Sequence, residues 1–493
     1  MNYKSTRSLN EEYVSAANAI KNGLAPDGGL YMPESIPALT EDTLKELCAL
    51  SYSERAAKIM SLFLTDYTYE ELLSDCKEAY GDNFDGYAAP VVSVGDKMRI
   101  LELWHGPTCA FKDMALQIMP RLLSRALTKT GEERTALILV ATSGDTGKAA
   151  LEGYRDIDKI KISVYYPVNG VSRAQKLQMT TQEGANVNVC AINGNFDDAQ
   201  NGVKKIFGDT DFAAELDKKG YFLSSANSIN WGRLVPQTVY YISAWCDLYN
   251  KGEIAFGEKI DVCVPTGNFG NILAAYIAKL MGLPVGRFIC ASNSNNVLTD
   301  FFKTGTYDRN RDFHVTISPS MDILISSNLE RLLFLAAGAE NTRNYMASLA
   351  KDGKYTLDAE DYGKIASEFV GYFTSEDECR DEIKSVFGTY SYLIDTHTAV
   401  ALSAADRYAD ENTNASGKIV VASTASPYKF ASSVAGALEL EICDDDAKIF
   451  ETLSSHTSTK VPSQLSDVLT KEIRFKTVIN PEDMKASVID FIS

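Results

Sequence analysis

From about residue 90 onward, short runs rich in Val, Ile and Leu alternate with helical stretches. Several of these runs are apolar at nearly every position, which indicates burial on both faces and is typical of a parallel sheet covered by helices. The pattern therefore predicts an α/β fold. The candidate strands are residues 97–104, 135–141, 161–167, 187–192, 221–226, 261–266, 287–292 and 418–423.

The first 90 residues have a different pattern, in which apolar residues recur at the helical period. Residues 10–23, 41–50, 53–64 and 68–80 are candidate helices, and Gly23 is expected to end the first of them. The pattern of residues 340–386 predicts that they form an added helical segment in the second half of the chain. We find no internal repeat and no low-complexity segment.

Composition narrows the classes of function. The chain has 493 residues, enough for about three domains. Its net charge of −18 repels nucleic acid and anionic membranes, so neither is an expected partner. No apolar stretch approaches the ~20 residues that span a bilayer, and the first residues lack the apolar segment of a secretory signal.

Cysteine and histidine usage adds two expectations. The nine cysteines form no C-x-x-C pair and are expected to be reduced, as in a cytoplasmic protein. The four histidines have no metal-binding spacing, so no metal site is predicted.

Ligands of open parallel sheets bind beyond the carboxyl ends of the strands, and the most informative strand end is that of residues 261–266. The strand runs into Gly267-Asn268-Phe269-Gly270-Asn271, and a helix follows. Two glycines and a helix N-terminus can direct backbone N–H groups at a phosphate. The alternative is a tight turn, for which Gly and Asn are also usual. Because a full G-x-G-x-x-G and an acidic ribose ligand are missing, a single phosphate fits better than a dinucleotide.

The strand at 135–141 is followed by Thr142-Ser143-Gly144-Asp145-Thr146-Gly147-Lys148 and a helix. Its hydroxyls and N–H groups suit a small carboxylate or another anion, although they are also what an ordinary helix cap provides. A P-loop would need Gly at 142 and Ser or Thr at 149, so the nucleotide interpretation fails.

Lys112 follows a strand and the turn His105-Gly106-Pro107-Thr108, close to the start of an apolar helix. A buried lysine has a lowered pKa and becomes nucleophilic. Considered alone, an ordinary exposed lysine remains the alternative. The strand at 418–423 also ends in hydroxyls, Ser423 and Thr424, which could face a neutral ring nitrogen or simply cap a helix. Ser426-x-x-Lys429 and Lys303-Thr304-Gly305 match β-lactamase motifs only by chance, since their order is wrong.

These segments resemble threonine synthases of the bacterial and fungal branch, nearly end to end. The matching segments are 3–7 (YKSTR), 23–34 (GLAPDGGLYMPE), 105–117 (HGPTCAFKDMALQ), 141–150 (ATSGDTGKAA), 227–237 (NSINWGRLVPQ), 265–284 (PTGNFGNILAAYIAKLMGLP), 318–334 (SPSMDILISSNLERLLF), 395–400 (DTHTAV) and 424–430 (TASPYKF). Ser426 departs from the family, which commonly has His there.

The resemblance implies a two-lobed pyridoxal-phosphate (PLP) enzyme of fold type II, similar to tryptophan synthase β, with an additional and largely helical N-terminal domain. The expected domains are residues 1–92, a large PLP domain of 93–140 and 255–493, and a small domain of 141–254. By resemblance, Lys112 carries the cofactor. Gly267, Asn268, Phe269 and Asn271 hold its phosphate, and Thr424 bonds the pyridine nitrogen.

The implied reaction releases phosphate from O-phospho-L-homoserine and adds water to give L-threonine. Thr142, Ser143, Asp145 and Thr146 are expected at the ring hydroxyl and the substrate carboxylate. Asn230 and Arg233 are expected at the substrate phosphate, with Lys148 and Arg173 in reserve. The alternatives are another fold type II lyase, such as threonine dehydratase, and a catalytically inactive synthase-like homologue. Whether the protein is a monomer or a homodimer stays open.

Overall fold

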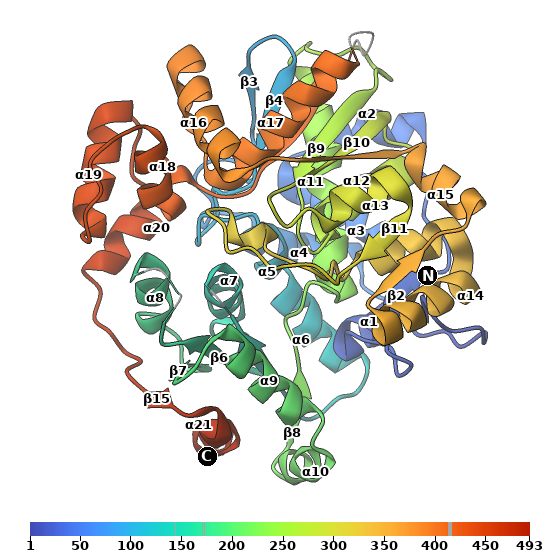
Figure 1. Ribbon diagram of the computed structural model, residues 1–493. Helices are drawn as coiled ribbons and strands as arrows, with labels where there is room; N and C mark the ends of the chain where they lie inside the picture. The colour runs from blue at the N-terminus through green and yellow to red at the C-terminus, as the bar shows by residue number, and fades with distance from the viewer. Residues whose placement is uncertain (143, 170, 172, 413–416) are drawn as a thin grey trace.

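Two separate β-sheets organise the computed structural model, which describes residues 1–493 except 143, 170, 172 and 413–416. The larger sheet has the order β13-β10-β9-β14-β4-β3, and its neighbouring strands are parallel except at the β3–β4 pair. Figure 1 shows this sheet in the upper body of the molecule. Its strands are β3 (Val91–Val94), β4 (Met98–Glu102), β9 (Ile260–Pro265), β10 (Val285–Ser292), β13 (Phe369–Phe373) and β14 (Ile419–Ser423).

The smaller sheet has the order β15-β7-β6-β5-β8 and is parallel throughout. It lies in the lower body of Figure 1. Its strands are β5 (Thr135–Ala141), β6 (Ile160–Pro167), β7 (Val187–Ile192), β8 (Tyr221–Ser224) and β15 (Val478–Ile479). Two short antiparallel pairs complete the strands: β1 (Tyr3–Ser5) with β2 (Tyr31–Pro33), and β11 (Thr306–Asp308) with β12 (Lys354–Thr356).

Helices surround both sheets. The α-helices are α1 (Ala16–Asn22), α2 (Glu41–Cys48), α3 (Tyr52–Phe63), α4 (Tyr69–Ala79), α5 (Asp113–Leu116), α6 (Met119–Lys129), α7 (Asp145–Tyr154), α8 (Arg173–Thr180), α9 (Phe196–Phe207), α10 (Thr210–Lys218), α11 (Trp231–Asn250), α12 (Gly270–Leu280), α13 (Val297–Thr304), α14 (Leu329–Asp352), α15 (Ala359–Ala366), α16 (Glu376–Tyr390), α17 (Thr396–Glu411), α18 (Ala431–Ala437), α19 (Asp446–Thr457), α20 (Ser463–Ser466) and α21 (Met484–Ile492). Two 3₁₀ turns matter below, η1 (Pro319–Met321) and η2 (Pro427–Phe430).

Alternating side chains of each strand belong to different apolar clusters, because successive residues of a strand point to opposite faces. In the larger sheet, Val262 and Val264 join a central cluster with α11 and α12, whereas Cys263 joins a second cluster with α17. In the smaller sheet, Ile138 joins the same central cluster, whereas Leu139 packs with α9 and α21. The central cluster also contains the N-terminal helices α1 to α4, so one core is common to both sheets and the N-terminal region.

The predicted strands are all present, but the sheets divide the chain differently from the expected domains. β5, which the boundary at residue 140 assigns to the large domain, pairs with β6 and β8 in the smaller sheet. The C-terminal β15 and α21 also pack on the smaller sheet, through β7 and α9. The segment 340–386 is not only helical, because its strand β13 forms an edge of the larger sheet. Strand partners depend on tertiary packing, which a local apolar run does not encode.

The first predicted helix is shorter than expected. It begins at Ala16 rather than at residue 10, and the Ser15 side chain accepts the N–H of Asn18 as its cap. Val14 instead pairs with Tyr3 as an isolated bridge. Gly23 ends the helix with a φ of 70°, as predicted.

Close contact between α7 and α5 brings the two lobes together near Lys112. A Cβ on Gly153 of α7 would lie 1.9 Å from the carbonyl oxygen of Leu116 in α5, so only glycine fits. This backbone approach sets the distance between the start of α7, which carries Asp145, and the residue preceding α5, which is Lys112.

We therefore expect Gly153→Ala to lower the free energy of unfolding by about 2–3 kcal/mol, because an overpacked backbone contact must open. Gly363→Ala is the matched control, since Gly363 lies in α15 with nothing within 4 Å of an added Cβ. The control should gain about 0.5–1 kcal/mol from helix propensity. Urea unfolding of both variants measures this, and an unchanged Gly153→Ala midpoint would contradict the contact.

Candidate functional site

The predicted cofactor residues follow the carboxyl ends of the strands β4, β9 and β14 of the larger sheet. The backbone N–H of Phe111 donates to the carbonyl of Thr424 at 2.8 Å, and Ala110 forms a bridge with Ala425. The loop that carries Lys112 therefore runs beside the end of β14. Thr424 is buried, and its hydroxyl makes no hydrogen bond to any side chain or backbone group of the described residues.

The turn before Lys112 is held by the carboxylate of Asp113. It accepts the backbone N–H of Thr108 at 2.8 Å and the Thr108 hydroxyl at 2.6 Å. Burial raises the pKa of Asp113 to about 6, although both bonds from Thr108 oppose the rise. A Cβ on Gly106 would lie 2.7 Å from the side chain of Asp113, so the turn needs glycine there. Asp113 thus fixes the loop that presents Lys112.

Lys112 shares a buried carboxylate with a second lysine. Its Nζ lies 3.7 Å from Oδ2 of Asp145, and Nζ of Lys429 lies 3.2 Å from Oδ1 of the same residue. Lys429 also donates to the carbonyl of Thr108 at 2.6 Å. The Lys112 side chain is 11% exposed and that of Lys429 only 1%. Two buried ammonium groups therefore face one carboxylate.

Burial and charge act in opposite directions on these groups. Burial lowers the pKa of Lys112, and the nearby cations Lys429 and Arg233 lower it further, whereas Asp145 raises it. Burial alone would raise the pKa of Asp145, but Lys429 and Lys112 hold it well below its usual range. Lys112 is thus nearer to its neutral, nucleophilic form than an exposed lysine, beside a carboxylate that stays charged.

Ser320 and His397 complete the surroundings of Lys112, and neither was a sequence-based candidate. Nζ of Lys112 donates to the hydroxyl of Ser320 at 3.2 Å, and this hydroxyl donates to Asp145 at 3.3 Å. The backbone N–H of Ser320 donates to Nε2 of His397 at 3.2 Å. Nδ1 of His397 lies 2.8 Å from Asp395. Ser320 and His397 lie in two of the segments that carry the family resemblance, 318–334 and 395–400. Because each segment matches over many residues, the resemblance did not single out either side chain.

The loop at residues 267–271, called the cradle below, has the free backbone donors that an anion-binding loop needs. Within the described part of the chain, the backbone N–H groups of these five residues donate to no acceptor. Phe269 has a left-handed φ of 63°, which turns successive N–H groups toward one side at the start of α12. A Cβ on Gly267 would lie 2.6 Å from the carbonyl oxygen of Ser320, so the cradle adjoins the neighbour of Lys112.

The carbonyl groups of the same loop are already occupied. The hydroxyl of Ser326 donates to the carbonyl of Gly267 at 2.6 Å. The backbone and side-chain N–H groups of Asn328 both donate to the carbonyl of Asn268, each at 3.0 Å. Because the bonds from Ser326 and Asn328 occupy these two carbonyl groups, the backbone N–H groups of the loop remain free to bind an anion.

Asn271 adds a side-chain donor to the cradle. Its Oδ1 accepts the hydroxyls of Tyr240 and Tyr241, both at 2.6 Å. Its Nδ2 is buried and is one of the side-chain atoms that find no partner among the described residues. An unpaired buried amide is costly, and a bound phosphate would satisfy it.

The candidates near the start of α7 differ in what their side chains do. Thr142 accepts the N–H groups of Gly144 and Gly147, each at 3.0 Å, so its hydroxyl braces the turn. Asp145 is the charged partner described above. Thr146 is half-buried in the first helical turn, where backbone N–H groups can bind a carboxylate. Ser143 lies outside the described residues.

Arg233 and Asn230 lie at the start of α11. Arg233 is buried, and its Nη1 donates to the carbonyl of Ala226 at 2.6 Å, while its Nε has no partner among the described residues. Burial lowers the pKa of Arg233 to about 10, so it remains charged at neutral pH. Asn230 caps α11 by accepting the N–H of Gly232 and donates to the carbonyl of Ile20. Both ends of the Asn230 amide thus have structural bonds, whereas Arg233 has no carboxylate partner among the residues that the structure describes.

The two reserve cations are engaged elsewhere. Nζ of Lys148 lies 2.9 Å from Glu152 and donates to Gln182 at 2.6 Å. Arg173 donates to the carbonyl of Asp444 at 3.2 Å on the exposed surface. The positive charge of Lys148 is already balanced by the carboxylate of Glu152.

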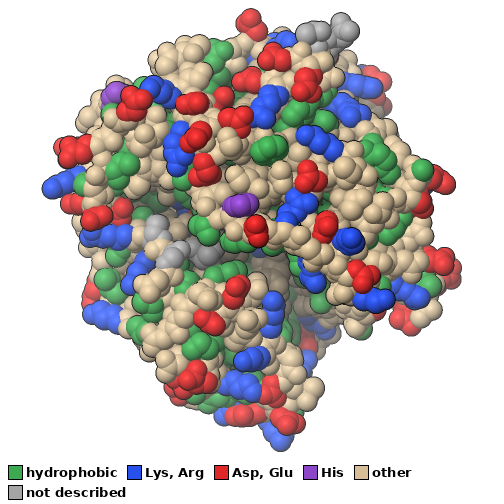
Figure 2. Space-filling model, viewed as in Figure 1, with side chains coloured by type: hydrophobic (Ala, Val, Ile, Leu, Met, Phe, Trp, Pro, Cys, Tyr) green, Lys and Arg blue, Asp and Glu red, His purple; other side chains and the backbone are tan. Residues whose placement is uncertain are grey.

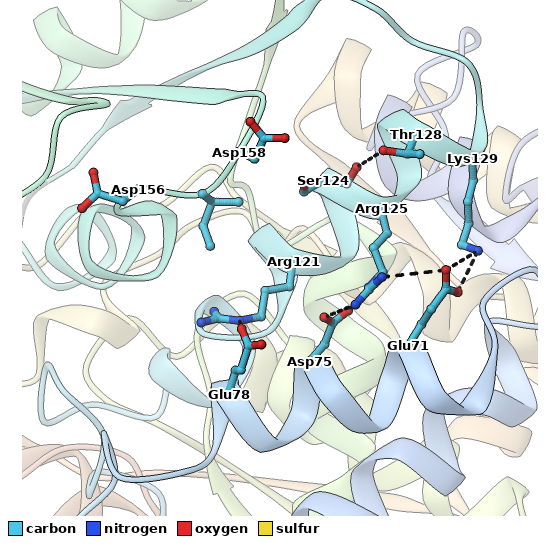
Figure 3. A pocket seen from close by; sticks show the side chains of 11 residues that line it. Glu71, Asp75, Glu78, Arg121, Ser124, Arg125, Thr128, Lys129, Asp156 and Asp158 are labelled. Carbon is cyan, nitrogen blue, oxygen red and sulfur yellow. Dashed lines mark hydrogen bonds and ion pairs between the residues drawn. The ribbon is translucent and has the colours of Figure 1, made fainter.

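A separate groove of about 390 Å³ lies between α4 and α6, away from these residues. Figure 3 shows its cations and carboxylates pairing with one another across the two helices. Arg125 pairs with Asp75 at 2.5 Å, and Lys129 pairs with Glu71 at 2.8 Å. The ion pairs of this groove therefore join α4 to α6.

Figure 2 shows the surface hollowed between the larger upper body and the smaller lower body. No group of three or more His, Cys, Asp or Glu that could hold a metal occurs in the described ranges. Across the same ranges, no helix is both long and apolar enough to span a bilayer.

Comparison with known families gives three matches along the chain. Residues 2–80 match the family described as "Threonine synthase N terminus", residues 94–425 match "Pyridoxal-phosphate dependent enzyme", and residues 398–492 match "Threonine synthase, C-terminal".

Individual relatives have similar descriptions. Threonine synthase-like 1 from Homo sapiens is 42% identical over 90% of this chain, and the chain spans about 60% of that relative's length. Threonine synthase from Saccharomyces cerevisiae is 36% identical, with 92% of this chain and 93% of the relative covered. The crystal structure of PLP-bound threonine synthase from Brucella melitensis has a TM-score of 0.88 and 36% identity, and covers 100% of this chain and 99% of its own.

The cradle predicts a graded response to changes at Asn271. Asn271→Ala removes one donor to a bound phosphate and should weaken phosphate binding roughly ten- to a hundredfold. Asn271→Asp keeps the acceptor for both tyrosines but adds a negative charge, so the loss should be larger still. Isothermal titration of the full-length chain with inorganic phosphate measures both. Equal affinities of the two variants would show that position 271 does not face the anion.

Proposed function

Since the chain belongs to the threonine synthase family of pyridoxal-phosphate-dependent enzymes, we propose that it converts O-phospho-L-homoserine and water to L-threonine and phosphate. The observation that carries the proposal is a buried site with two separate positions for anions. One is the cradle at residues 267–271, and the other is the buried Arg233, which has no carboxylate partner among the described residues. A PLP enzyme with a phosphorylated substrate needs both.

The residues around Lys112 fit PLP. The free N–H groups of the cradle and the unpaired Nδ2 of Asn271 suit the cofactor phosphate. The hydroxyl of Thr424 would donate to the pyridine nitrogen, and Lys112 would hold the cofactor covalently through its amine. When bound, PLP supplies an electron-withdrawing ring that stabilises negative charge on the substrate carbon next to the amine.

The protein's own groups would then handle protons and position the substrate. Lys112, whose pKa burial lowers, would take the proton from Cα. Asp145 stays charged beside it and stabilises the ammonium form of Lys112 that results. The N-terminus of α7, including Thr146, would bind the substrate carboxylate.

Arg233 is the proposed reader of the substrate phosphate. A guanidinium binds phosphate through two donors at once, and the free Nε of Arg233 leaves room for such a contact. Asn230 is the weaker candidate, because its amide already caps α11.

Release of inorganic phosphate from O-phospho-L-homoserine is the direct test, with O-acetylserine and threonine as competing substrates. A threonine dehydratase would instead consume threonine, and an inactive homologue would release no phosphate. The inactive alternative is relevant because a similar protein is described only as threonine synthase-like. The retained, buried Lys112 supports the active enzyme. All nine cysteines are free, which supports a cytoplasmic location for it.

Lys112→Ala should abolish covalent attachment of PLP and the yellow colour of the loaded protein. Threonine formation should fall by several orders of magnitude, because the attachment point and the base are lost together. Borohydride reduction of the loaded parent followed by peptide mapping identifies the attached residue. Lys429→Met is the matched control, since Lys429 is also buried beside Asp145. An adduct on Lys429, or on any lysine other than Lys112, would refute the assignment.

Arg233→Met removes the charge but keeps much of the side-chain volume. We expect the KM for O-phospho-L-homoserine to rise roughly ten- to a hundredfold, the size of a lost charge-assisted contact. PLP binding should not change, because the cradle is intact. Inhibition by inorganic phosphate provides a second measurement, and equal inhibition of variant and parent would show that Arg233 does not bind the phosphate.

A further inference from the structure

The side chain of Lys429 connects the larger lobe to the smaller one. Its Nζ donates to the carbonyl of Thr108 at 2.6 Å and lies 3.2 Å from Oδ1 of Asp145. Thr108 belongs to the loop between β4 of the larger sheet and α5, whereas Asp145 starts α7, which follows β5 of the smaller sheet. The Lys429 side chain is 1% exposed. A buried ammonium depends on such acceptors, because burial without them costs several kcal/mol.

The backbone that carries Lys429 is fixed to the loop that presents Lys112. The N–H of Ser426 donates to the carbonyl of Cys109 in that loop at 3.0 Å. The N–H of Lys429 donates in turn to the carbonyl of Ser426 at 2.9 Å, within the short turn η2. The Lys429 ammonium is therefore held relative to the Lys112 loop at both ends of its side chain.

The two oxygens of Asp145 have different partners. Oδ1 faces Lys429 and accepts Nε2 of Gln175 at 2.8 Å. Oδ2 faces Nζ of Lys112 at 3.7 Å and accepts the hydroxyl of Ser320 at 3.3 Å. The ion pair with Lys429 is thus the shorter of the two, so Asp145 balances the charge of Lys429 better than that of Lys112.

We propose that Lys429 is a positioning residue, which holds the Asp145 carboxylate of the smaller lobe against the Lys112 loop and supplies a fixed positive charge beside the Lys112 amine. Lys112 keeps its own, longer ion pair with Asp145. When Lys112 gives up its proton, Lys429 and Asp145 remain as a balanced buried pair. The inference deepens the proposed function and rests on it for the role of Lys112 as the base.

The charged groups that face Lys112 and Asp145 agree with this role. Burial lowers the pKa of Lys112 and Asp145 raises it, whereas the cations of Lys429 and Arg233 lower it. Burial would raise the pKa of Asp145, but Lys429, Lys112 and His397 together hold it well below its usual range.

Removing the charge of Lys429 has two effects on Lys112, and both have the same sign. A repelling cation is lost, and the charge of Asp145 is no longer shared. Each change favours the ammonium form of Lys112. The pKa of Lys112 should therefore rise, and less neutral amine should remain at pH 7.

The experiment uses the full-length chain stripped of PLP and then mixed with PLP at a series of pH values. The rate at which the visible absorbance of the attached cofactor forms reports the neutral amine of Lys112. In Lys429→Met its midpoint should move up by about one pH unit, equivalent to roughly tenfold slower attachment at pH 7.

Three further variants separate the charge of Lys429 from its packing. Lys429→Gln retains a donor for the carbonyl of Thr108 but not the charge, so it should give the same upward shift even if Lys429→Met does not fold. Lys429→Arg retains the charge and should keep the parental midpoint. Asp145→Asn removes the anion and should move the midpoint down, the opposite direction to Lys429→Met.

Lys148→Met is the matched control for loss of a buried lysine. Lys148 lies in α7 like Asp145 and is buried, but its Nζ pairs with Glu152 at 2.9 Å and donates to Gln182 at 2.6 Å. Because this variant leaves both ion pairs of Asp145 in place, its midpoint should equal that of the parent.

An unchanged or lowered midpoint in the Lys429→Met and Lys429→Gln variants would overturn the proposal. An equal upward shift in Lys148→Met or Lys429→Arg would do the same, because it would trace the effect to packing. The attachment rate does not depend on the identity of the substrate. If the parent attaches PLP but releases no phosphate from O-phospho-L-homoserine, the proposed function fails, and the attachment midpoint still decides the role of Lys429.

Discussion

The buried carboxylate of Asp145 is the interaction around which the site is organised. Burying an ammonium group costs several kcal/mol unless a counter-charge is present, and here two lysines, Lys112 and Lys429, depend on one carboxylate. The excess of positive charge, to which the buried Arg233 adds, makes the site attractive to anions although the whole chain carries a charge of −18. Because Asp145 starts α7, whereas Lys112 directly precedes α5 and Lys429 lies in η2, the same ion cluster joins the two lobes.

The cradle depends on a second constraint, namely that every buried backbone group needs a partner. Ser326 and Asn328 occupy its carbonyl groups, and Asn328 in turn accepts a hydrogen bond from Arg331. Arg331 is fully buried and also donates to the carbonyl of Tyr31. The N–H groups of the cradle are thus left for a ligand by a chain of bonds that reaches the N-terminal region.

The N-terminal region is therefore part of the site's support rather than an independent addition. Its helices share the central apolar core with both sheets. Arg7 pairs with Glu330, the neighbour of Arg331, at 2.7 Å, and the hydroxyl of Thr6 donates to the same carboxylate at 2.5 Å. These contacts give residues 3–7 (YKSTR) a structural role next to Arg331, whose bond to Asn328 supports the cradle.

The sequence by itself determined the positions of the strands, because a continuous apolar run is a local signal of a buried strand. It also offered Lys112, Asp145, Thr424 and residues 267–271 as site candidates, because they lie in loops that follow such strands, and the family resemblance suggested their roles. It did not show that β5 and β15 belong to the smaller sheet or that β13 joins the larger one, since strand partners are set by packing. Nor did it identify Ser320, His397 and Lys429 as neighbours of Lys112. It also did not distinguish the capping amide of Asn230 from Arg233, whose Nε has no partner among the described residues. Ser320 lies 208 residues from Lys112 and 175 from Asp145 along the chain. Only the tertiary structure decides such contacts, because a hydrogen bond depends on distance in space and leaves no periodic pattern in the sequence.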